Sequence, residues 1–225
     1  MIKVRNLNKS FGKFLILNDI NLELEMGKIY GFVGENGSGK TTLFKCIAGL
    51  ENFEGTINSD YEPLKNHVGL LLAEPHFIGK MTAREYIILM CNARGISYEE
   101  IEKQNIFELP LDRYASLYST GMKKKLALFA ILLQKNDFFI LDEPFNGVDI
   151  QSNMMITELI LKLKNSGKTL IVSSHIFSSL TDISDEIFLL KNGQIGKSFN
   201  KEKYELLEAE MKKNSFTKKL SDLDF

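Results

Sequence analysis

A glycine-rich loop between an apolar run and an amphipathic segment most constrains what this chain can fold into. The apolar run is Ile29 to Val33, and the segment after the loop, Thr41 to Leu50, carries Leu43 and Ile47 at helical spacing. Such a run before a glycine-rich turn is typical of a buried parallel strand, and the spacing that follows predicts a helix. The loop fits the pattern G-x-x-x-x-G-K-[ST], and its residues are Gly34, Glu35, Asn36, Gly37, Ser38, Gly39, Lys40 and Thr41.

The chemistry that this loop suits is the binding of phosphate groups. Glycines let the backbone turn tightly and aim successive N–H groups at phosphate oxygens, and the following helix adds the positive end of its dipole. We expect Lys40 to reach the β and γ phosphates, Thr41 to be a ligand of Mg²⁺, and Thr42 to contribute to the same site. A plain glycine-rich loop is the alternative, but the four fixed positions would occur by chance in roughly one such chain in a hundred. The sequence therefore predicts a site for a nucleoside triphosphate.

The rest of the periodicity predicts a P-loop NTPase of the α/β class. Residues 2–33 alternate in short β-like pieces and predict an N-terminal antiparallel part. Between about 75 and 135 this alternation disappears, which indicates an inserted helical sub-lobe. The helices that we expect in it cover 82–93, 98–107 and 120–134.

Strand character returns after the sub-lobe and predicts a mostly parallel sheet as the core. Phe138 to Leu141 and Thr169 to Ser173 are apolar runs with a helical stretch near 152–163 between them, which is a βαβ pattern. Asn192-Gly193 between two further apolar pieces predicts a hairpin that closes the sheet edge. We expect one cassette over residues 1–196. A polar, helical tail over 197–225 would be either solvated or a contact for a partner.

Composition and charge exclude several classes of protein. Lys+Arg 28 against Asp+Glu 29 gives a formal net charge of -1, so no global positive field favours a nucleic-acid partner. The apolar runs are far shorter than the roughly 20 residues that span a bilayer, and residues 1–10 lack the apolar stretch of a secretory signal. We therefore expect a cytoplasmic protein, with Cys46 and Cys91 as buried free thiols.

Two carboxylates and a histidine follow the predicted strands at the edge where parallel sheets bind ligands. Asp142 and Glu143 come directly after one predicted strand, and His175 follows the next. We expect Asp142 to hold Mg²⁺ or its water shell, and Glu143 to polarise the water that attacks the γ phosphate. His175 can bond the γ phosphate or that water. The alternatives are solvated turn charges and a structural histidine, and the four apolar residues before Asp142 argue against the first.

One further motif connects these features to a known family. Ser119-Thr120-Gly121-Met122 stands at the start of a predicted helix just upstream of Asp142, although Ser119 is also a good helix N-cap in its own right. Together with the glycine-rich loop, this order of motifs resembles the nucleotide-binding subunit of ABC transporters over about residues 1–196. The resemblance implies an ATPase that uses ATP and Mg²⁺.

The resemblance also implies site residues and partners. Phe11 would stack on adenine, Ser119 and Gly121 would contact ATP bound to the opposite subunit, and Asp149 would lie at the dimer seam. The active unit would be a head-to-tail dimer, either a homodimer or a heterodimer. It would power a separately encoded transmembrane permease, and through it would lie on the inner face of the cell membrane. The wording of the motif is similar to a variant seen in many bacterial export systems, which favours export.

Ala73 is a departure from the family pattern. The family usually places Gln, or sometimes Glu, where Ala73 aligns, and this side chain contacts Mg²⁺ and the membrane partner in relatives. Either the adjacent Glu74 substitutes for it or the register is shifted by one residue. The isolated cassette is accordingly expected to be a slow ATPase.

Other functions fit the sequence less well. A GTPase would need Asn-Lys-x-Asp, which Gln134 to Asp137 does not match, and a small-molecule kinase has no need for Glu143, His175 and the Ser119 motif together. DNA-repair relatives carry long insertions for which the sub-lobe leaves no room, and translation-factor relatives carry two cassettes. The remaining alternative is a soluble ABC ATPase that serves a cytoplasmic assembly complex.

Overall fold

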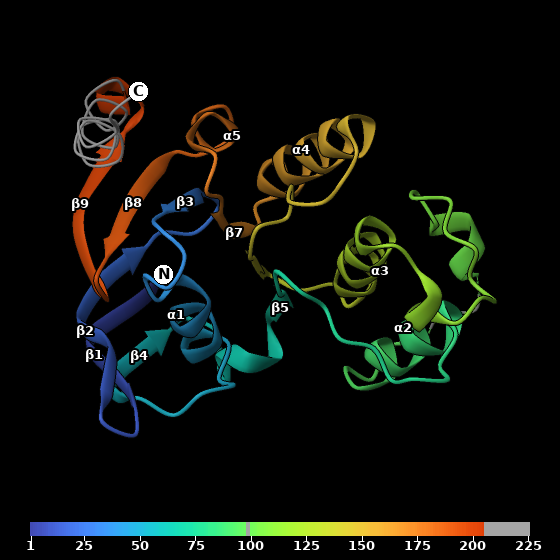
Figure 1. The fold of residues 1–225 in the computed structure, drawn as a ribbon, viewed down its shortest axis with the longest axis horizontal. Coiled ribbons are helices and arrows are strands. Elements are labelled where there is room, and N and C mark those ends of the chain that lie inside the picture. The colour runs from blue at the N-terminus through green and yellow to red at the C-terminus, as the bar shows by residue number, and fades with distance from the viewer. Residues whose placement is uncertain (98–99, 205–225) are drawn as a thin grey trace, which may run out of the picture.

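The computed structural model describes residues 1–97 and 100–204, which form a small sheet, a larger sheet and a helical part at one end (Figure 1). The strands are β1 Ile2–Phe11, β2 Phe14–Leu24, β3 Ile29–Val33, β4 Glu54–Ser59, β5 Val68–Leu71, β6 Phe138–Leu141, β7 Thr169–Ser173, β8 Glu186–Lys191 and β9 Gln194–Asn200. The helices are α1 Lys40–Ile47, α2 Ala83–Asn92, α3 Thr120–Leu133, α4 Ile150–Asn165 and α5 Phe177–Thr181. Strands β4 and β5 and helix α5 are additions to the elements expected from the sequence.

The small sheet is the predicted antiparallel part. Its order is β2-β1-β4, and both pairings are antiparallel. Along β1, Ile2 and Val4 are buried while Lys3 and Arg5 are exposed, which is the alternation of a strand with one face on a core. The sequence prediction for this region is confirmed.

The larger sheet has the order β5-β6-β7-β3-β8-β9. All pairings are parallel except the last, in which β9 runs antiparallel to β8 at the edge. Every residue of β3, β6 and β7 is buried, because helices or the small sheet cover both faces of a parallel sheet of this kind. The predicted βαβ unit and the mostly parallel core are confirmed.

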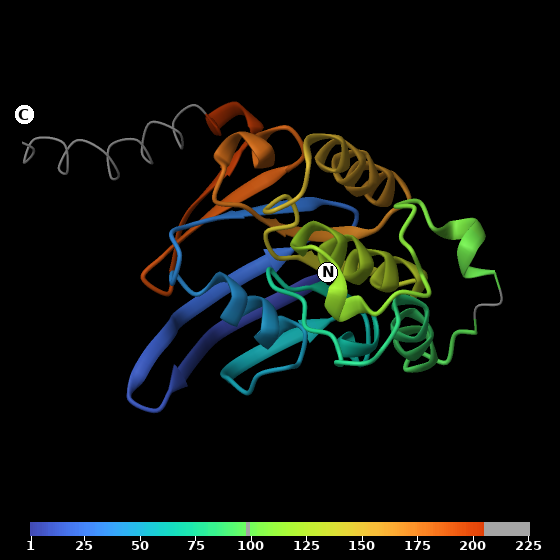
Figure 2. The same cartoon turned by 45° about the vertical axis from the view of Figure 1, so that its right-hand side comes forward.

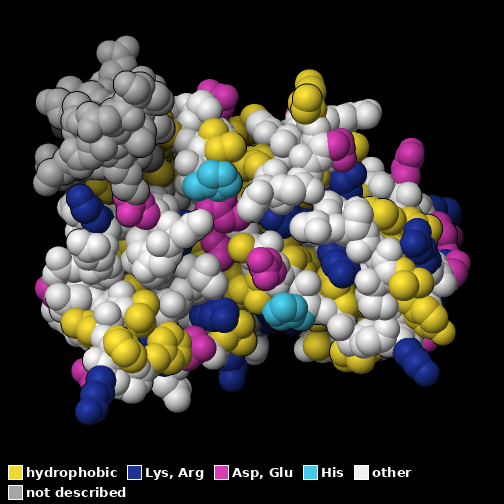
Figure 3. All heavy atoms as spheres, viewed as in Figure 1, with side chains coloured by type: hydrophobic (Ala, Val, Ile, Leu, Met, Phe, Trp, Pro, Cys, Tyr) yellow, Lys and Arg dark blue, Asp and Glu magenta, His cyan; other side chains and the backbone are white. Residues whose placement is uncertain are grey.

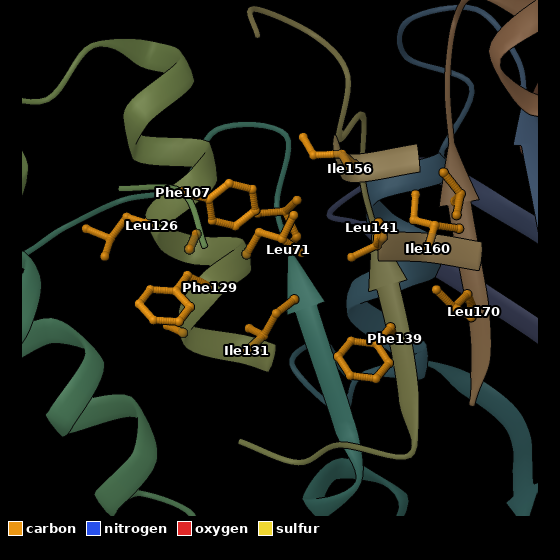
Figure 4. Packing of buried hydrophobic residues seen from close by; sticks show 14 of the residues in the cluster. Leu71, Phe107, Leu126, Phe129, Ile131, Phe139, Leu141, Ile156, Ile160 and Leu170 are labelled. Atoms are coloured by element: carbon orange, nitrogen blue, oxygen red, sulfur yellow. The ribbon is translucent and has the colours of Figure 1, made fainter. Parts of the chain in front are cut away.

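Alternate residues of β6 enter two different cores. Phe139 and Leu141 pack with residues of α3 and α4, as Figure 4 shows, whereas Phe138 and Ile140 pack with residues of α1 and the small sheet. This alternation follows from the period of two residues in a strand. The strand that carries Asp142 at its end is therefore held from both sides.

The helical part lies beside β5 at one end of the larger sheet (Figure 2). Helix α2 begins with a capping box, in which the Thr82 side chain accepts from the Glu85 amide and the Glu85 carboxylate accepts from the Thr82 amide. Helices α2 and α3 match the expected 82–93 and 120–134. No helix of the described residues is both long and apolar enough to span a membrane.

The prediction of a helix over residues 98–107 is wrong. Residues 98–99 lie outside the described residues, and from there the chain forms only the 3-10 turn Ile101–Gln104. Asn105 ends this turn because its side chain donates to the Leu109 carbonyl at 2.9 Å and accepts from the Leu109 amide at 3.0 Å. Such bonds between side chain and backbone compete with helical ones.

The C-terminal boundary also differs from the expectation. Asn192 and Gly193 have positive φ angles of 50° and 73° and form the turn of the predicted hairpin. Strand β9 continues to Asn200, and Tyr204 is buried with its hydroxyl 3.0 Å from the Ser184 carbonyl oxygen. The folded unit thus extends past residue 196, and the rest of the expected tail, 205–225, lies outside the described residues. Cys46 and Cys91 are buried free thiols, as expected.

Candidate functional site

The loop Gly34–Thr41, called the cradle below, connects the end of β3 to the start of α1. Gly37 and Gly39 have φ angles of 83° and 106°, in the left-handed region that favours glycine. A Cβ on Gly39 would also lie 2.8 Å from a side-chain carbon of Leu17, so a larger residue would clash there. The backbone geometry therefore explains why these two positions are glycines.

The ammonium group of Lys40 lies inside this loop. It donates to the carbonyl oxygens of Gly34 at 2.7 Å and Glu35 at 3.3 Å, and the residue is 7% exposed. The hairpin turn of β8 and β9 supports the cradle from outside, since the Gly193 amide donates to the Ser38 carbonyl at 3.1 Å. The cradle is thus ordered by contacts within it and with a distant turn.

A hollow of about 310 Å³ opens beside the cradle. It brings together residues from the end of β1, the cradle, the segment after β5 and the end of β6, although they are far apart in the sequence. The residues that line it are Phe11, Ile16, Asn36, Gly37, Ser38, Gly39, Lys40, Thr41, Thr42, Ala73, Asp142 and Glu143. The structure thus gathers most of the predicted site around one cavity.

Asp142 lies at the buried end of this hollow and is 1% exposed. One carboxylate oxygen accepts from the Thr41 hydroxyl at 2.5 Å, and the other accepts from the Ser173 hydroxyl at 2.6 Å. The Ser173 hydroxyl in turn accepts from the Glu143 amide at 2.9 Å. Ser173 was missed by sequence reasoning, although it ends a predicted strand next to the one that carries Asp142.

Glu143 and His175 lie against each other where β6 and β7 end. The Glu143 carboxylate is 2.9 Å from His175 Nδ1 and accepts from the His175 amide at 3.3 Å. Its side chain is only 12% exposed, whereas that of His175 is 51% exposed. His175 lines a second hollow of about 330 Å³, which shares Glu143 with the first. The parallel neighbours β6 and β7 therefore bring the two residues together as predicted.

Phe11 lies at the open rim of the cradle hollow. Its side chain is 47% exposed, and the ammonium of Lys9 lies 4.5 Å from its ring centroid. An exposed ring of this kind offers a face to a flat ligand. Ala73 lines the same hollow, whereas the neighbouring Glu74 is exposed and is not among its lining residues.

The other predicted residues lie outside this hollow. Ser119 caps α3 and accepts from the Met122 amide at 3.2 Å, and a Cβ on Gly121 would lie 2.9 Å from the Gly147 carbonyl oxygen. Asp149 caps α4, where it accepts from the Ser152 amide at 2.9 Å. Within this chain, none of Ser119, Gly121 and Asp149 lines the cradle hollow.

The carboxylate of Asp149 is held by two further contacts. The Ser152 hydroxyl donates to it at 2.7 Å and the Lys125 ammonium lies at 3.2 Å. These hydrogen bonds, those from Ser152 foremost, hold the pKa of Asp149 well below its usual range. Asp149 is therefore a charged cap that connects α4 to α3.

On the face shown in Figure 3, acidic and histidine side chains meet near the middle of the molecule, between the larger sheet and the helical part. Lysine and arginine side chains are scattered around them and form no continuous stripe on this face.

Comparisons with known proteins agree with this geometry. The family model for the ABC transporter matches residues 17–146. The lantibiotic transport ATP-binding protein SrtF of Streptococcus pyogenes is 32% identical over 87% of this chain and 89% of that protein. The bacitracin transport ATP-binding protein BcrA of Enterococcus faecalis is 32% identical over 89% of this chain and 69% of that protein.

Solved structures have the same fold. An ATP-binding subunit of an ABC transporter superposes with a TM-score of 0.81 at 25% identity, over 89% of this chain and 90% of that one. A dimeric ATP-binding cassette in a post-hydrolysis state, bound to ADP and Pi, has a TM-score of 0.80 at 22% identity, over 89% and 99%. The range that the family model matches includes the cradle and the carboxylates that follow β6. The chain belongs to the ABC transporter family, in which it is an ATP-binding and ATP-hydrolysing subunit.

Proposed function

We propose that ATP is bound and hydrolysed in the cradle hollow, with Lys40 facing the β and γ phosphates and Phe11 stacked on the adenine. The observation that carries this proposal is the convergence of Lys40, Thr41, Asp142 and Glu143 on one cavity of about 310 Å³. The amides of the cradle and the N-terminal end of α1 favour anions at the same place. The other cradle residues, with Thr42, would complete the phosphate contacts.

The residues at the buried end of the hollow fit a magnesium ion. The Thr41 hydroxyl and the Asp142 carboxylate are 2.5 Å apart, and Mg²⁺ prefers oxygen ligands of these types, with phosphates and water at its other positions. No group of three or more His, Cys, Asp and Glu side chains in the described residues could enclose a metal by itself, which suits an ion shared with ATP. When bound, Mg²⁺ would offset charge on the phosphates.

Glu143 would act on the water that attacks the γ phosphate. Glu143 lines the hollow, its side chain is largely shielded from solvent, and its carboxylate contacts the ring and the amide of His175. A positioned carboxylate of this kind can orient the water and accept its proton as the new bond to phosphorus forms. His175 would fix the direction of the carboxylate and exchange protons with it.

The second ATP contact would come from another cassette. Ser119 and Gly121 lie at the start of α3, outside the hollow of their own chain, and Asp149 is an exposed cap near them. A head-to-tail dimer would bring this helix start over the γ phosphate in the opposite cradle. The folded unit over residues 1–204 would be the working cassette, with the residues after it as a tail.

A separate transmembrane permease would be the other partner, and through it the cassette would work at the inner face of the cell membrane. The names of the relatives, lantibiotic and bacitracin transport proteins, support transport as the coupled process. The wording of the motif at Ser119 favours export as its direction. The permease would contact the segment after β5. Ile78 is exposed in this segment, and Leu117 is exposed in the 3-10 turn before α3. The Ser116 hydroxyl in that turn donates to the Gly79 carbonyl at 3.0 Å.

Affinity purification from detergent-solubilised membranes tests the partner. We expect a membrane subunit to co-purify with the tagged cassette and to be lost on Ile78→Glu. Leu50→Glu is the matched control, because Leu50 is 63% and Ile78 62% exposed. Recovery of only non-membrane proteins would instead support an ATPase of a cytoplasmic assembly complex.

A further inference from the structure

Lys124 is a buried lysine that no motif explains. It lies in α3, is 1% exposed, and precedes the buried residues Leu126, Ala127 and Leu128 in the helix. An ammonium group in such a place is costly unless it is fully bonded. No ion pair to Lys124 occurs among the described residues. The buried ammonium group of Lys124 therefore needs specific hydrogen-bond acceptors.

That contact is with the turn that carries Glu143. The Lys124 ammonium donates to the carbonyl oxygens of Glu143 and Asn146, each at 2.7 Å. The Asn146 amide donates to the same Glu143 carbonyl at 3.3 Å and closes the turn 143–146. One buried cation thus bridges both ends of the turn.

The turn needs such a restraint. Glu143 has a φ angle of 50°, in the left-handed region that a glutamate rarely adopts. Backbone strain of this kind persists only where the surroundings over-determine it. On the other side of the residue, the Glu143 amide is held by the Ser173 hydroxyl. Lys124 holds its carbonyl, so the peptide groups on both sides of Glu143 are fixed.

We propose that Lys124 is a positioning residue, which fixes the turn 143–146 and thereby aims the Glu143 carboxylate at the attacking water. The inference rests on the proposed role of Glu143 in hydrolysis. Lys124 also connects α3, the helix that Ser119 caps, to the turn that carries Glu143 in the same chain. ATP contacts at the start of α3 would then affect the position of Glu143 through this connection.

Burial lowers the pKa of Lys124 below the ordinary lysine value, and the negative charges of Glu143, Asp142 and Glu74 offset part of this effect.

The test replaces Lys124 by Met, which keeps the length of the chain without its donor, and by Gln, which keeps a donor. Lys123→Met is the matched control one residue away. Turnover at saturating Mg-ATP and ATP affinity are measured in the wild-type and in the Glu143→Gln background. Circular dichroism and thermal melting report the fold, and Lys124→Gln carries the test alone if Lys124→Met does not fold.

We expect Lys124→Met to lower kcat by about ten- to a hundredfold, since small displacements of a catalytic group cost this much. ATP affinity should stay within about threefold, and Lys124→Gln should lose less. In the Glu143→Gln background, Lys124→Met should have little further effect, because no charged base remains to be aimed. Lys123→Met should behave as wild type.

Three results would overturn the inference. The first is a kcat of Lys124→Met within about twofold of wild type. The second is the same fractional loss in both backgrounds, which would mean that Lys124 does not act through Glu143. The third is a parallel loss of kcat, ATP affinity and melting temperature, which would indicate a structural role. If kcat is low in Glu143→Gln but normal in Lys124→Met, only the inference about Lys124 is refuted. If Glu143→Gln has the kcat of the wild type, the proposed function of Glu143 is refuted as well.

Discussion

Replacing Glu143 by Gln is the sharpest test of the proposed chemistry. The side chain is 12% exposed, and its carboxylate lies 2.9 Å from His175 Nδ1 and accepts from the His175 amide at 3.3 Å. A glutamine of the same shape can accept through its remaining oxygen, so the geometry should survive. Only the negative charge and the capacity to take a proton are removed.

The expected loss follows from the function that is removed. General-base work contributes about 10²- to 10⁴-fold in rate, and a hundredfold corresponds to about 2.7 kcal/mol at 1.36 kcal/mol per factor of ten. We therefore expect kcat to fall by about 10²-fold or more. ATP affinity should be retained, because Lys40, Thr41 and the cradle amides are unchanged.

Phosphate release at saturating Mg-ATP measures the turnover, and calorimetry measures ATP affinity. Size-exclusion chromatography with ATP adds a second readout, since a cassette that binds ATP without hydrolysing it should accumulate as a dimer. Glu158→Gln is the control, because Glu158 is an exposed glutamate on α4. Hydrolysis by Glu143→Gln at the wild-type rate would remove Glu143 from the reaction, and the reasoning about this site would be wrong.

Lys40→Ala should abolish binding of Mg-ATP in calorimetry, because the cradle loses the charge that faces the phosphates, and near-normal affinity would contradict it. Ala73→Gln should raise ATP turnover, because it places an amide in the hollow that Ala73 lines. Glu74→Ala should lower turnover only if Glu74 supplies the missing oxygen. If neither variant changes turnover, with or without the permease, this segment is only a connector. Burial alone would raise the pKa of Asp185, but the Lys164 ammonium at 2.5 Å and the Ile29 amide at 2.9 Å hold it below the ordinary value of an aspartate. The contribution of Asp185 to the free energy of unfolding is therefore present above the ordinary aspartate pKa and is lost as the pH falls through the lowered pKa of the folded state. Asp185→Asn should lower the urea midpoint at pH 7, and the difference from wild type should shrink as the solution is made acidic. An equal difference at pH 7 and in acid would contradict this.

The strand, loop and helix that form the cradle could be predicted from the sequence alone. The strand Ile29–Val33, the loop and helix α1 are contiguous, so the motif and the local hydrophobic period contain all the information that they need. The capped starts of α2 and α3 and the hairpin turn at Asn192 were predictable for the same reason. Each depends on residues only a few positions apart.

The sequence prediction was wrong at one local turn, and it was wrong or silent where contacts between distant residues decide. The expected helix over 98–107 gives way to a 3-10 turn because the Asn105 side chain bonds the backbone of Leu109. Ser173 was not recognised, because its contact with Asp142 depends on which strand lies beside β6. The C-terminal boundary was placed too early, because pairing of β9 with β8 continues to Asn200.

By itself, the sequence predicted a glycine-rich loop with Lys40 and carboxylates at the end of a buried strand, and the structure places these residues around one hollow. Only the tertiary structure decided how those groups are held. In the sequence, Lys124 is one of three consecutive lysines on a predicted helix. In the fold, its ammonium donates to carbonyl oxygens of the turn that carries Glu143. The physical reason is that a motif fixes local backbone geometry, whereas the partner of a buried polar group is set by the order of the strands and the packing of helices against them.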